Sequence, residues 1–168
     1  GSLLWRFKRI PYVCTFHGYY KPRFSRRIVK CSGVRTISIS RAVAEHLSGD
    51  LKIPEKNIRV VYNGVDLRGY EVALPRKEIR ERYKICGQPV VGIVARLSAE
   101  KNHKVLIKAF HLFLGDYPEA VLLIAGAGRL ENDLKAFVGK EGISERVIFL
   151  RDVEIPQVFA VLDVFVLI

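Results

Sequence analysis

Two cations stand beside a short polar turn that joins an apolar run to a segment of helical period. The apolar run ends at Arg96, Lys101 follows within the turn, and the helical pattern begins directly behind it. A helix start offers unpaired backbone N–H groups and the positive end of the helix dipole, and phosphate is the anion most often bound there. We therefore predict an anion site at Arg96 and Lys101. A solvated turn with ordinary surface charges is the alternative.

Other expected strand ends also carry polar residues or glycines. Ligands of open parallel sheets bind at the carboxyl ends of the strands, so these positions are further site candidates. Each has a plain structural alternative, such as an Asn-Gly turn or a histidine that only closes a strand, and the two-glycine turn lacks the third glycine of a dinucleotide fingerprint. No Asp-rich metal motif is present, and no metal is expected. The candidate positions are His17, Gly18, Asn63, Gly64, Gly126, Gly128 and Arg151.

Apolar segments alternate with helical patterns from residue 88 onward. Continuous apolar strands separated by helices indicate a parallel sheet covered on both faces, which is an α/β fold. The helix expected over 102–118 has an apolar face of Val105, Leu106, Ala109, Leu112 and Phe113. Before residue 73 the same alternation is looser, with strands expected at 11–18, 34–40 and 58–64 and a helix after Ser40. We predict two pieces, 1–72 and 89–168, joined by a charged helical linker at 73–88.

The net charge of +11 is concentrated near the start of the chain. No Asp or Glu occurs from Gly1 to Ala44, whereas that stretch holds ten Lys and Arg residues. Such a field attracts nucleic acid, anionic lipid headgroups or phosphorylated substrates, although a solvated face is the plain alternative. Aromatic residues such as Tyr19 and Tyr20 interleave with the cations, as in single-strand-binding modules. A basic nucleic-acid-binding module is therefore an alternative function, but it leaves the turn at Arg96 and Lys101 unexplained.

Other features of the composition limit the classes of protein to which the chain can belong. No apolar run reaches the roughly 20 residues that a membrane-spanning helix needs. Three scattered cysteines form no metal spacing and favour a reducing compartment. The chain has no Met and no signal-peptide layout at its start, and we expect it to be an internal piece of a longer protein.

The order and spacing of several short motifs resemble one enzyme family. The resemblance is to the retaining GT-B glycosyltransferases of the glycosyl transferase group 1 (GT4) family, and it covers nearly the whole chain. The motifs are "TFHG" at 15–18, "TISISRAVAEHL" at 36–47, "NGVD" at 63–66, "VARLSAEKN" at 94–102, "LLIAGAG" at 122–128, "RVIFL" at 146–150 and "DVFVL" at 163–167.

The resemblance implies transfer of a sugar, with retained anomeric configuration, from a nucleotide diphosphate sugar to an acceptor hydroxyl. It implies two Rossmann-like pieces of a GT-B fold: the later part of an acceptor-binding domain and the first part of a nucleotide-sugar-binding domain. It assigns Arg96 and Lys101 to the donor diphosphate and His17 to the reacting sugar. Arg151 follows a strand where many members have Gly. No cofactor is implied, because the UDP- or GDP-linked sugar is a substrate.

The partners expected from the resemblance and the charge are a glycan or lipid-linked acceptor and an anionic membrane surface, with no nucleic acid. The expected location is cytoplasmic and peripheral on the inner face of the membrane. The Glu-x7-Glu motif of the family would follow Ile168 and is absent, so we expect both domains to be incomplete and the chain to be inactive alone. A GT-B sugar-nucleotide epimerase, which also binds a diphosphate, is the second alternative.

Overall fold

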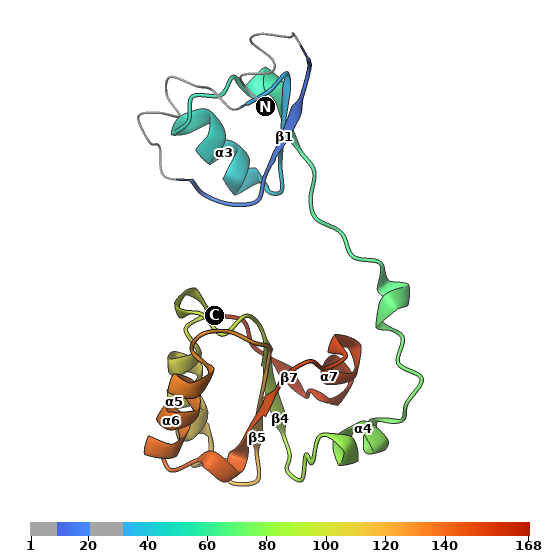
Figure 1. Cartoon of the computed structure of the whole chain (residues 1–168), viewed down its shortest axis with the longest axis vertical. Coiled ribbons are helices and arrows are strands. Elements are labelled where there is room, and N and C mark those ends of the chain that lie inside the picture. Colours follow the sequence, from blue (N-terminus) through green and yellow to red (C-terminus); the bar gives the residue numbers. More distant parts are fainter. Residues whose placement is uncertain (1–9, 21–31) are drawn as a thin grey trace. The chain divides into compact units, whose positions relative to one another are not determined.

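The computed structural model describes residues 10–20 and 32–168, and the chain divides into two compact units, Gly1–Val65 and Asp66–Ile168 (Figure 1). Both units are α/β, and both sheets are parallel. The predicted fold class is therefore confirmed. The predicted linker, 73–88, lies inside the second unit, and its boundaries stay a prediction.

The first unit holds three short parallel strands in the order β1-β2-β3. They are β1 (Val13–Phe16), β2 (Arg35–Ser38) and β3 (Ile58–Val60), and α3 (Arg41–Gly49) follows β2. The Ser40 hydroxyl accepts a hydrogen bond from the backbone N–H of Val43 at 3.2 Å, which confirms the predicted helix start. The buried core among the described residues of this unit consists of Val43, Leu47, Ile53 and Ile58.

The second unit alternates strands and helices, and its four parallel strands lie in the order β6-β5-β4-β7. A 3-10 turn, η3 (Ala99–Lys101), stands between β4 and α5. The other elements are η2 (Leu67–Tyr70), α4 (Arg76–Arg82), β4 (Val90–Val94), α5 (His103–Phe113), β5 (Val121–Ala125), α6 (Glu131–Lys140), η4 (Ser144–Arg146), β6 (Val147–Leu150), α7 (Ile155–Val161) and β7 (Val164–Phe165).

Two hydrophobic cores cover the two faces of this second sheet. Ile93 and Leu122 point into the core under α5 and α6, whereas Val90 and Leu123 point into the core under α4 and α7. Alternate side chains of a strand face opposite sides, so buried strands that supply both cores must be apolar throughout. Figure 1 shows the two helix pairs on opposite sides of the sheet. Burial of each large apolar side chain in these cores stabilises the folded state by roughly 1.5–3 kcal/mol relative to leaving it exposed.

The buried face of α5 differs from the predicted one. The structure buries His103, Leu106, Ile107 and Phe110, whereas Val105 is 56% exposed and Leu112 is 81% exposed. Apolar residues occur at helical spacing on two faces of this helix, and only the sheet beneath it decides which face is covered. The prediction was right for Leu106 and wrong for Val105, Ala109 and Leu112. Phe113, the fifth residue of the predicted face, is half-buried and packs against the core.

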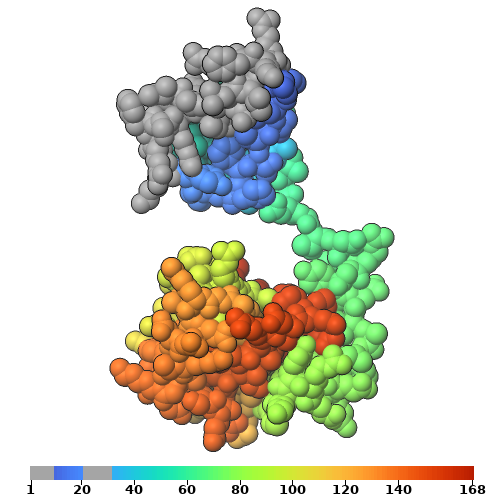
Figure 2. All heavy atoms as spheres, viewed as in Figure 1, coloured from blue at the N-terminus to red at the C-terminus, as the bar shows by residue number. Residues whose placement is uncertain are grey.

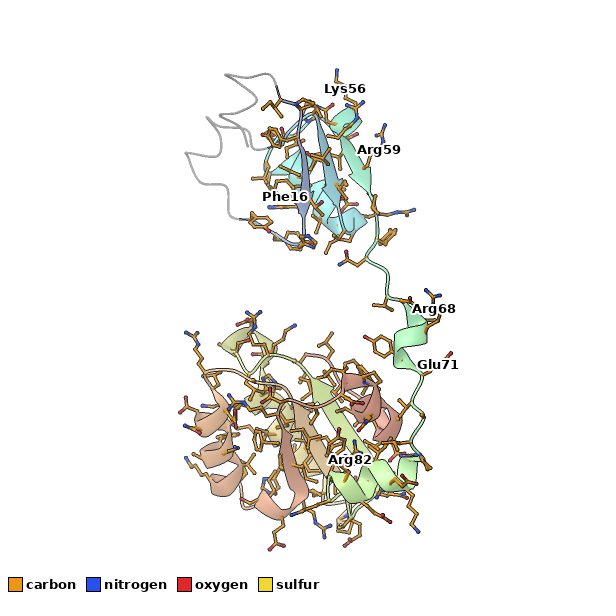
Figure 3. The ribbon with its side chains drawn as sticks, turned by 45° about the vertical axis from the view of Figure 1, so that its right-hand side comes forward. Phe16, Lys56, Arg59, Arg68, Glu71 and Arg82 are labelled. Carbon is orange, nitrogen blue, oxygen red and sulfur yellow. The ribbon has the colours of Figure 1, made fainter. Side chains whose placement is uncertain are left out.

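The charged helix α4 packs on the rest of the second unit through Ile79, its single apolar residue. Ile79 is fully buried in the core that α4 shares with α7, and the two helices lie side by side in Figure 2. Arg82, labelled in Figure 3, donates to the side-chain oxygen of Gln157 on α7 at 3.1 Å. Across residues 10–20 and 32–168, no helix has the length and apolar character needed to cross a membrane.

Candidate functional site

The loops that follow β4, β5 and β6 meet at the carboxyl edge of the second sheet, because the three strands are parallel. Backbone hydrogen bonds join these loops to one another. The N–H of Leu97 donates to the carbonyl of Ala127 at 3.0 Å, and the N–H of Gly126 donates to the carbonyl of Leu150 at 2.9 Å. The edge is therefore a connected backbone surface rather than three separate turns.

Gly126 and Gly128 are required by the close approach of the loop after β4. A Cβ atom at Gly126 would lie 2.1 Å from the carbonyl oxygen of Ala95, and one at Gly128 would lie 2.3 Å from that of Leu97. Gly126 also has a φ of +147°, which side chains rarely adopt. Packing alone accounts for both glycines, and their predicted contact with a ligand stays a prediction.

Arg96 and Lys101 follow β4 at this edge, as the sequence predicted. Arg96 is exposed and Lys101 is half-buried, and neither forms an ion pair within the described part of the chain. Lys101 ends η3, and Asn102 then turns the chain in the left-handed region, with φ 43°, into α5. No side chain of the described residues caps the first turn of α5. Two cations without an ion pair thus stand beside this helix start. The backbone N–H groups of Asn102 and Val105 donate to backbone carbonyls, whereas those of His103 and Lys104 have no backbone acceptor within the described ranges and are left for an anion.

Two further charged residues, Glu100 and Arg129, belong to this edge, although they are not among the residues predicted from the sequence. The Glu100 carboxylate accepts from its own backbone N–H and from the Ser98 hydroxyl, and it lies in the field of Arg96 and Arg129. These interactions lower its pKa and keep it ionised. Arg129 directly follows the two-glycine turn, and this position beside a strand end was the signal that could have identified it.

Arg151 follows β6, but a carboxylate opposes its charge. Its guanidinium lies 3.6 Å from Glu131 at the start of α6, and Lys135 donates to the same carboxylate at 2.8 Å. The hydrogen bond from Lys135, together with the charges of Lys135 and Arg151, lowers the pKa of Glu131. The Arg151 side chain is therefore less available to an anion than Arg96 or Lys101.

His103, the first residue of α5, is 2% exposed, and neither ring nitrogen has a hydrogen-bond partner among the described residues. Burial, and secondarily the charge of Lys101, lowers its pKa, so the imidazole is neutral at pH 7.

The candidate residues of the first unit lie at the carboxyl edge of their own sheet. His17 and Gly18 follow β1 after Phe16, which Figure 3 labels, and Asn63 and Gly64 follow β3. His17, Asn63 and Gly64 are exposed, and no atom of the described residues lies within 4 Å of a Cβ built at Gly18 or Gly64. Packing among the described residues does not explain these two glycines, in contrast to Gly126 and Gly128.

The backbone beyond His17 is held by His46 of α3. The Nε2 atom of His46 lies 3.1 Å from the backbone N of Tyr20 and 3.0 Å from its carbonyl oxygen, while Nδ1 lies 2.6 Å from the Asp50 carboxylate. The ring of Tyr19 packs edge-on against the same imidazole at 5.0 Å. Of the ten cations in the acid-free stretch, Arg35 and Arg41 are described, and the other eight lie outside the described residues.

The structure thus gathers the predicted residues in two groups, one in each unit. Arg96, Lys101, Gly126, Gly128 and Arg151 share one sheet edge, and the four candidates of the first unit share another. Within the described ranges, no three His, Cys, Asp or Glu side chains gather as a metal site would require.

Comparison with known families decides the class. The model described as "Glycosyl transferases group 1" matches residues 75–168, which is more than half of the chain, and "Glycosyltransferase Family 4" matches residues 1–68. The chain belongs to the glycosyl transferases group 1 family. The resemblance drawn from its short motifs is confirmed.

Relatives of known name support the same family. The 2-deoxystreptamine glucosyltransferase of Streptomyces kanamyceticus is 26% identical across 99% of this chain, which spans 49% of that relative. A GDP-mannose-dependent alpha-(1-6)-phosphatidylinositol monomannoside mannosyltransferase of Mycolicibacterium smegmatis is 33% identical across 54% of this chain, which spans 24% of that relative.

The Anabaena protein Alr3699/HepE, solved in complex with UDP-glucose, matches 98% of the chain with a TM-score of 0.81 and 23% identity, over 48% of its own length. At this identity the likeness shows a shared fold. The chain spans less than half the length of each of these three proteins.

Proposed function

We propose that this chain is part of a glycosyltransferase that moves a sugar from a nucleotide diphosphate sugar to an acceptor hydroxyl. The observation that carries the proposal is the pair of unpaired cations, Arg96 and Lys101, beside the uncapped start of α5. In this proposal the second unit binds the donor at the carboxyl edge of its sheet. Transfer itself is proposed for the whole protein, because the named relatives are at least twice as long as the chain.

The chemistry of the step accounts for the charge of this edge. When the bond between the sugar and the diphosphate breaks, negative charge grows on the departing phosphate oxygens. Fixed cations and oriented backbone N–H groups stabilise that charge as it develops and need no reorganisation. Arg96 and Lys101 act on the diphosphate in this proposal, and Arg129 supplies a third cation from the neighbouring loop. The nearby carboxylate of Glu100 lies in the field of Arg96 and Arg129, and within the described ranges it forms no ion pair with Lys101.

The first unit supplies the acceptor side. His17 is exposed at the end of β1, so its imidazole can hydrogen-bond a sugar hydroxyl or a carbonyl. Gly18, Asn63 and Gly64 lie in loops at the same sheet edge and are proposed to contact the substrate. The acceptor class is a glycan or a lipid-linked glycan. Retained anomeric configuration, inactivity of the chain by itself and a peripheral place at the cytoplasmic membrane surface remain predictions from the sequence.

The names of relatives and structural neighbours support a nucleotide-sugar donor. Alr3699/HepE was crystallised with UDP and with UDP-glucose, and the mycobacterial relative is named as GDP-mannose-dependent. The two nucleotides share the diphosphate, and that is the part of the donor for which Arg96 and Lys101 are proposed. The base and the sugar are left open.

Titration of the 15N-labelled chain with UDP or GDP tests the donor site. We expect the largest chemical-shift changes at the amides of residues 96–104 and 126–130, and weaker changes with UMP, which lacks the second phosphate. Arg96→Ala or Lys101→Ala should weaken binding by about tenfold, the loss expected for one charge-assisted hydrogen bond. Lys140→Ala, which removes an exposed lysine at the end of α6, should leave binding unchanged.

Shifts confined to other residues, or equal binding by all the variants, would contradict the donor site. Product analysis of the whole protein separates transfer from epimerisation. A glycoside supports the proposal, and an epimerised sugar nucleotide without any glycoside contradicts it.

A further inference from the structure

The short turn that carries His17 is anchored on both sides. Phe16, which ends β1 and is labelled in Figure 3, packs against the core of the first unit, and its carbonyl accepts from the backbone N–H of Ile39 at 3.4 Å. Tyr20 returns to the same place, because its ring meets the ring of Phe16 edge-on at 5.5 Å. The exposed His17 lies between these two anchors, so its position depends on how the chain is held at Tyr20.

His46 of α3 holds the chain at Tyr20. Its side chain is 8% exposed, and its Nε2 atom lies within hydrogen-bond distance of both backbone polar atoms of Tyr20, 3.1 Å from N and 3.0 Å from O. A histidine in the last turn of a helix commonly complements the helix dipole. The helix dipole does not account for contacts with a residue 26 positions away in the sequence.

Asp50 orients the imidazole of His46. Its carboxylate lies 2.6 Å from Nδ1, and an ionised carboxylate accepts hydrogen bonds but cannot donate them, so Nδ1 carries a proton. In the neutral ring, Nε2 then accepts from the N–H of Tyr20, whereas in the imidazolium it donates to the carbonyl of Tyr20. One hydrogen bond to Tyr20 is therefore available in either protonation state, and this suits the ring to holding the turn.

We propose that His46, oriented by Asp50, is a positioning residue that sets the place of His17 for sugar transfer. The proposal rests on the function proposed above, in which His17 hydrogen-bonds a sugar hydroxyl or a carbonyl. His46 itself touches no substrate and acts through the backbone of Tyr20. A displacement of a reacting or binding group by about 1 Å can lower turnover by roughly a hundredfold. Loss of His46 should therefore slow transfer and leave the donor site of the second unit unchanged.

Nuclear magnetic resonance of the 15N-labelled chain tests the hold on the turn without requiring catalysis. His46→Phe keeps a planar ring beside Tyr19 but removes both nitrogens, whereas His46→Gln supplies an amide that can accept from or donate to the backbone of Tyr20. We expect His46→Phe to shift the amide and ring resonances of His17 and the amide resonance of Gly18. His46→Gln should shift them less.

Two carboxylate variants on the same helix complete the series. Asp50→Asn removes the charge that orients the imidazole and changes a side chain that is 63% exposed, so it should shift the His17 resonances with the first unit still folded. Glu45→Gln is the matched control, because Glu45 is also exposed on α3 and forms no ion pair within the described ranges. It should leave His17 unchanged. If His46→Phe unfolds the first unit, Asp50→Asn decides the result.

Steady-state kinetics of the whole protein measure the consequence for transfer. We expect His46→Phe to lower kcat by about tenfold to a hundredfold with an unchanged KM for the nucleotide sugar, and His46→Gln to recover most of the rate. Glu45→Gln should transfer sugar at the parent rate.

Unchanged His17 resonances in both His46→Phe and Asp50→Asn would overturn the proposal, as would a normal kcat in His46→Phe. A rise in the donor KM without a fall in kcat would also overturn it. If the whole parent protein forms no glycoside, the proposed function fails, and the resonances of His17 still decide whether His46 sets its position.

Discussion

At the scale of single residues, the sequence predicted the site best where charge and strand ends coincide. Arg96 and Lys101 were found because a helix start directly behind two cations is a local pattern, and the structure leaves both unpaired within the described ranges. Arg129 and Glu100 were missed, because one charge beside a turn carries no spacing information. The isolation of His103 could not be predicted at all, since it depends on which face of α5 meets the sheet.

The buried His103 makes the stability of the second unit pH-dependent. Burial lowers the pKa of its imidazole below the unfolded value of about 6.5. Below that pH, His103 is therefore protonated more in the unfolded chain than in the folded chain, and this favours unfolding. The contribution to stability is therefore full above about pH 6.5. It falls as the pH decreases from there toward the folded pKa.

We predict that urea unfolding of the second unit shows a smaller loss of stability between pH 7.5 and 5.5 in His103→Leu than in the parent chain. A leucine side chain does not titrate, and it has no ring nitrogen that would lack a hydrogen-bond partner. An identical pH dependence in the two proteins would show that His103 is solvated or hydrogen-bonded in solution.

At the scale of the elements, sequence patterns located strands and helices but did not determine how they pack. Strands that supply two cores are apolar throughout, so β4 and β5 were recognisable from sequence alone. The charged composition of α4 suggested a linker, yet one buried residue, Ile79, was enough to attach it to the sheet. For α5 the sequence offered two apolar faces, and the prediction mostly chose the exposed one.

Substitutions on the two faces of α5 test this assignment. Ile107 is fully buried, and Ile107→Ala should lower the free energy of unfolding by about 2–5 kcal/mol through lost burial and a cavity. Leu112→Glu, on the exposed face, should change it by less than about 0.5 kcal/mol. Thermal or urea unfolding of both variants measures the difference. A large loss of stability in Leu112→Glu together with a small loss in Ile107→Ala would mean that the face predicted from the sequence is the buried one.

At the scale of the whole molecule, the two units share a parallel α/β plan but differ in how much of it is buried. The second unit has helices on both faces of its sheet and two extensive cores. Among the described residues of the first unit, one small core packs on α3, and strand residues such as Val13 and Val60 are 55% and 39% exposed. The sequence indicated this contrast, because the strand-helix alternation is regular after residue 88 and looser before residue 73.

Hydrogen exchange should therefore be slowest in the centre of the second sheet. β5 pairs with strands on both sides, and all five of its residues are buried, so its amides exchange only when much of the unit opens. β2 is also central in its sheet, but two of its four residues are not buried, and fewer apolar contacts oppose its opening.

Hydrogen exchange followed by mass spectrometry measures this difference. We predict that peptides spanning β5 retain protection longer than peptides spanning β2, both in the chain alone and in the presence of UDP. Both sets of peptides come from the same chain under the same conditions. Each measured exchange rate is compared with the intrinsic rate of that peptide's own sequence. Equal or greater protection of β2 would mean that the first unit is held by interactions beyond those of its described residues, and the predicted difference between the two units would be wrong.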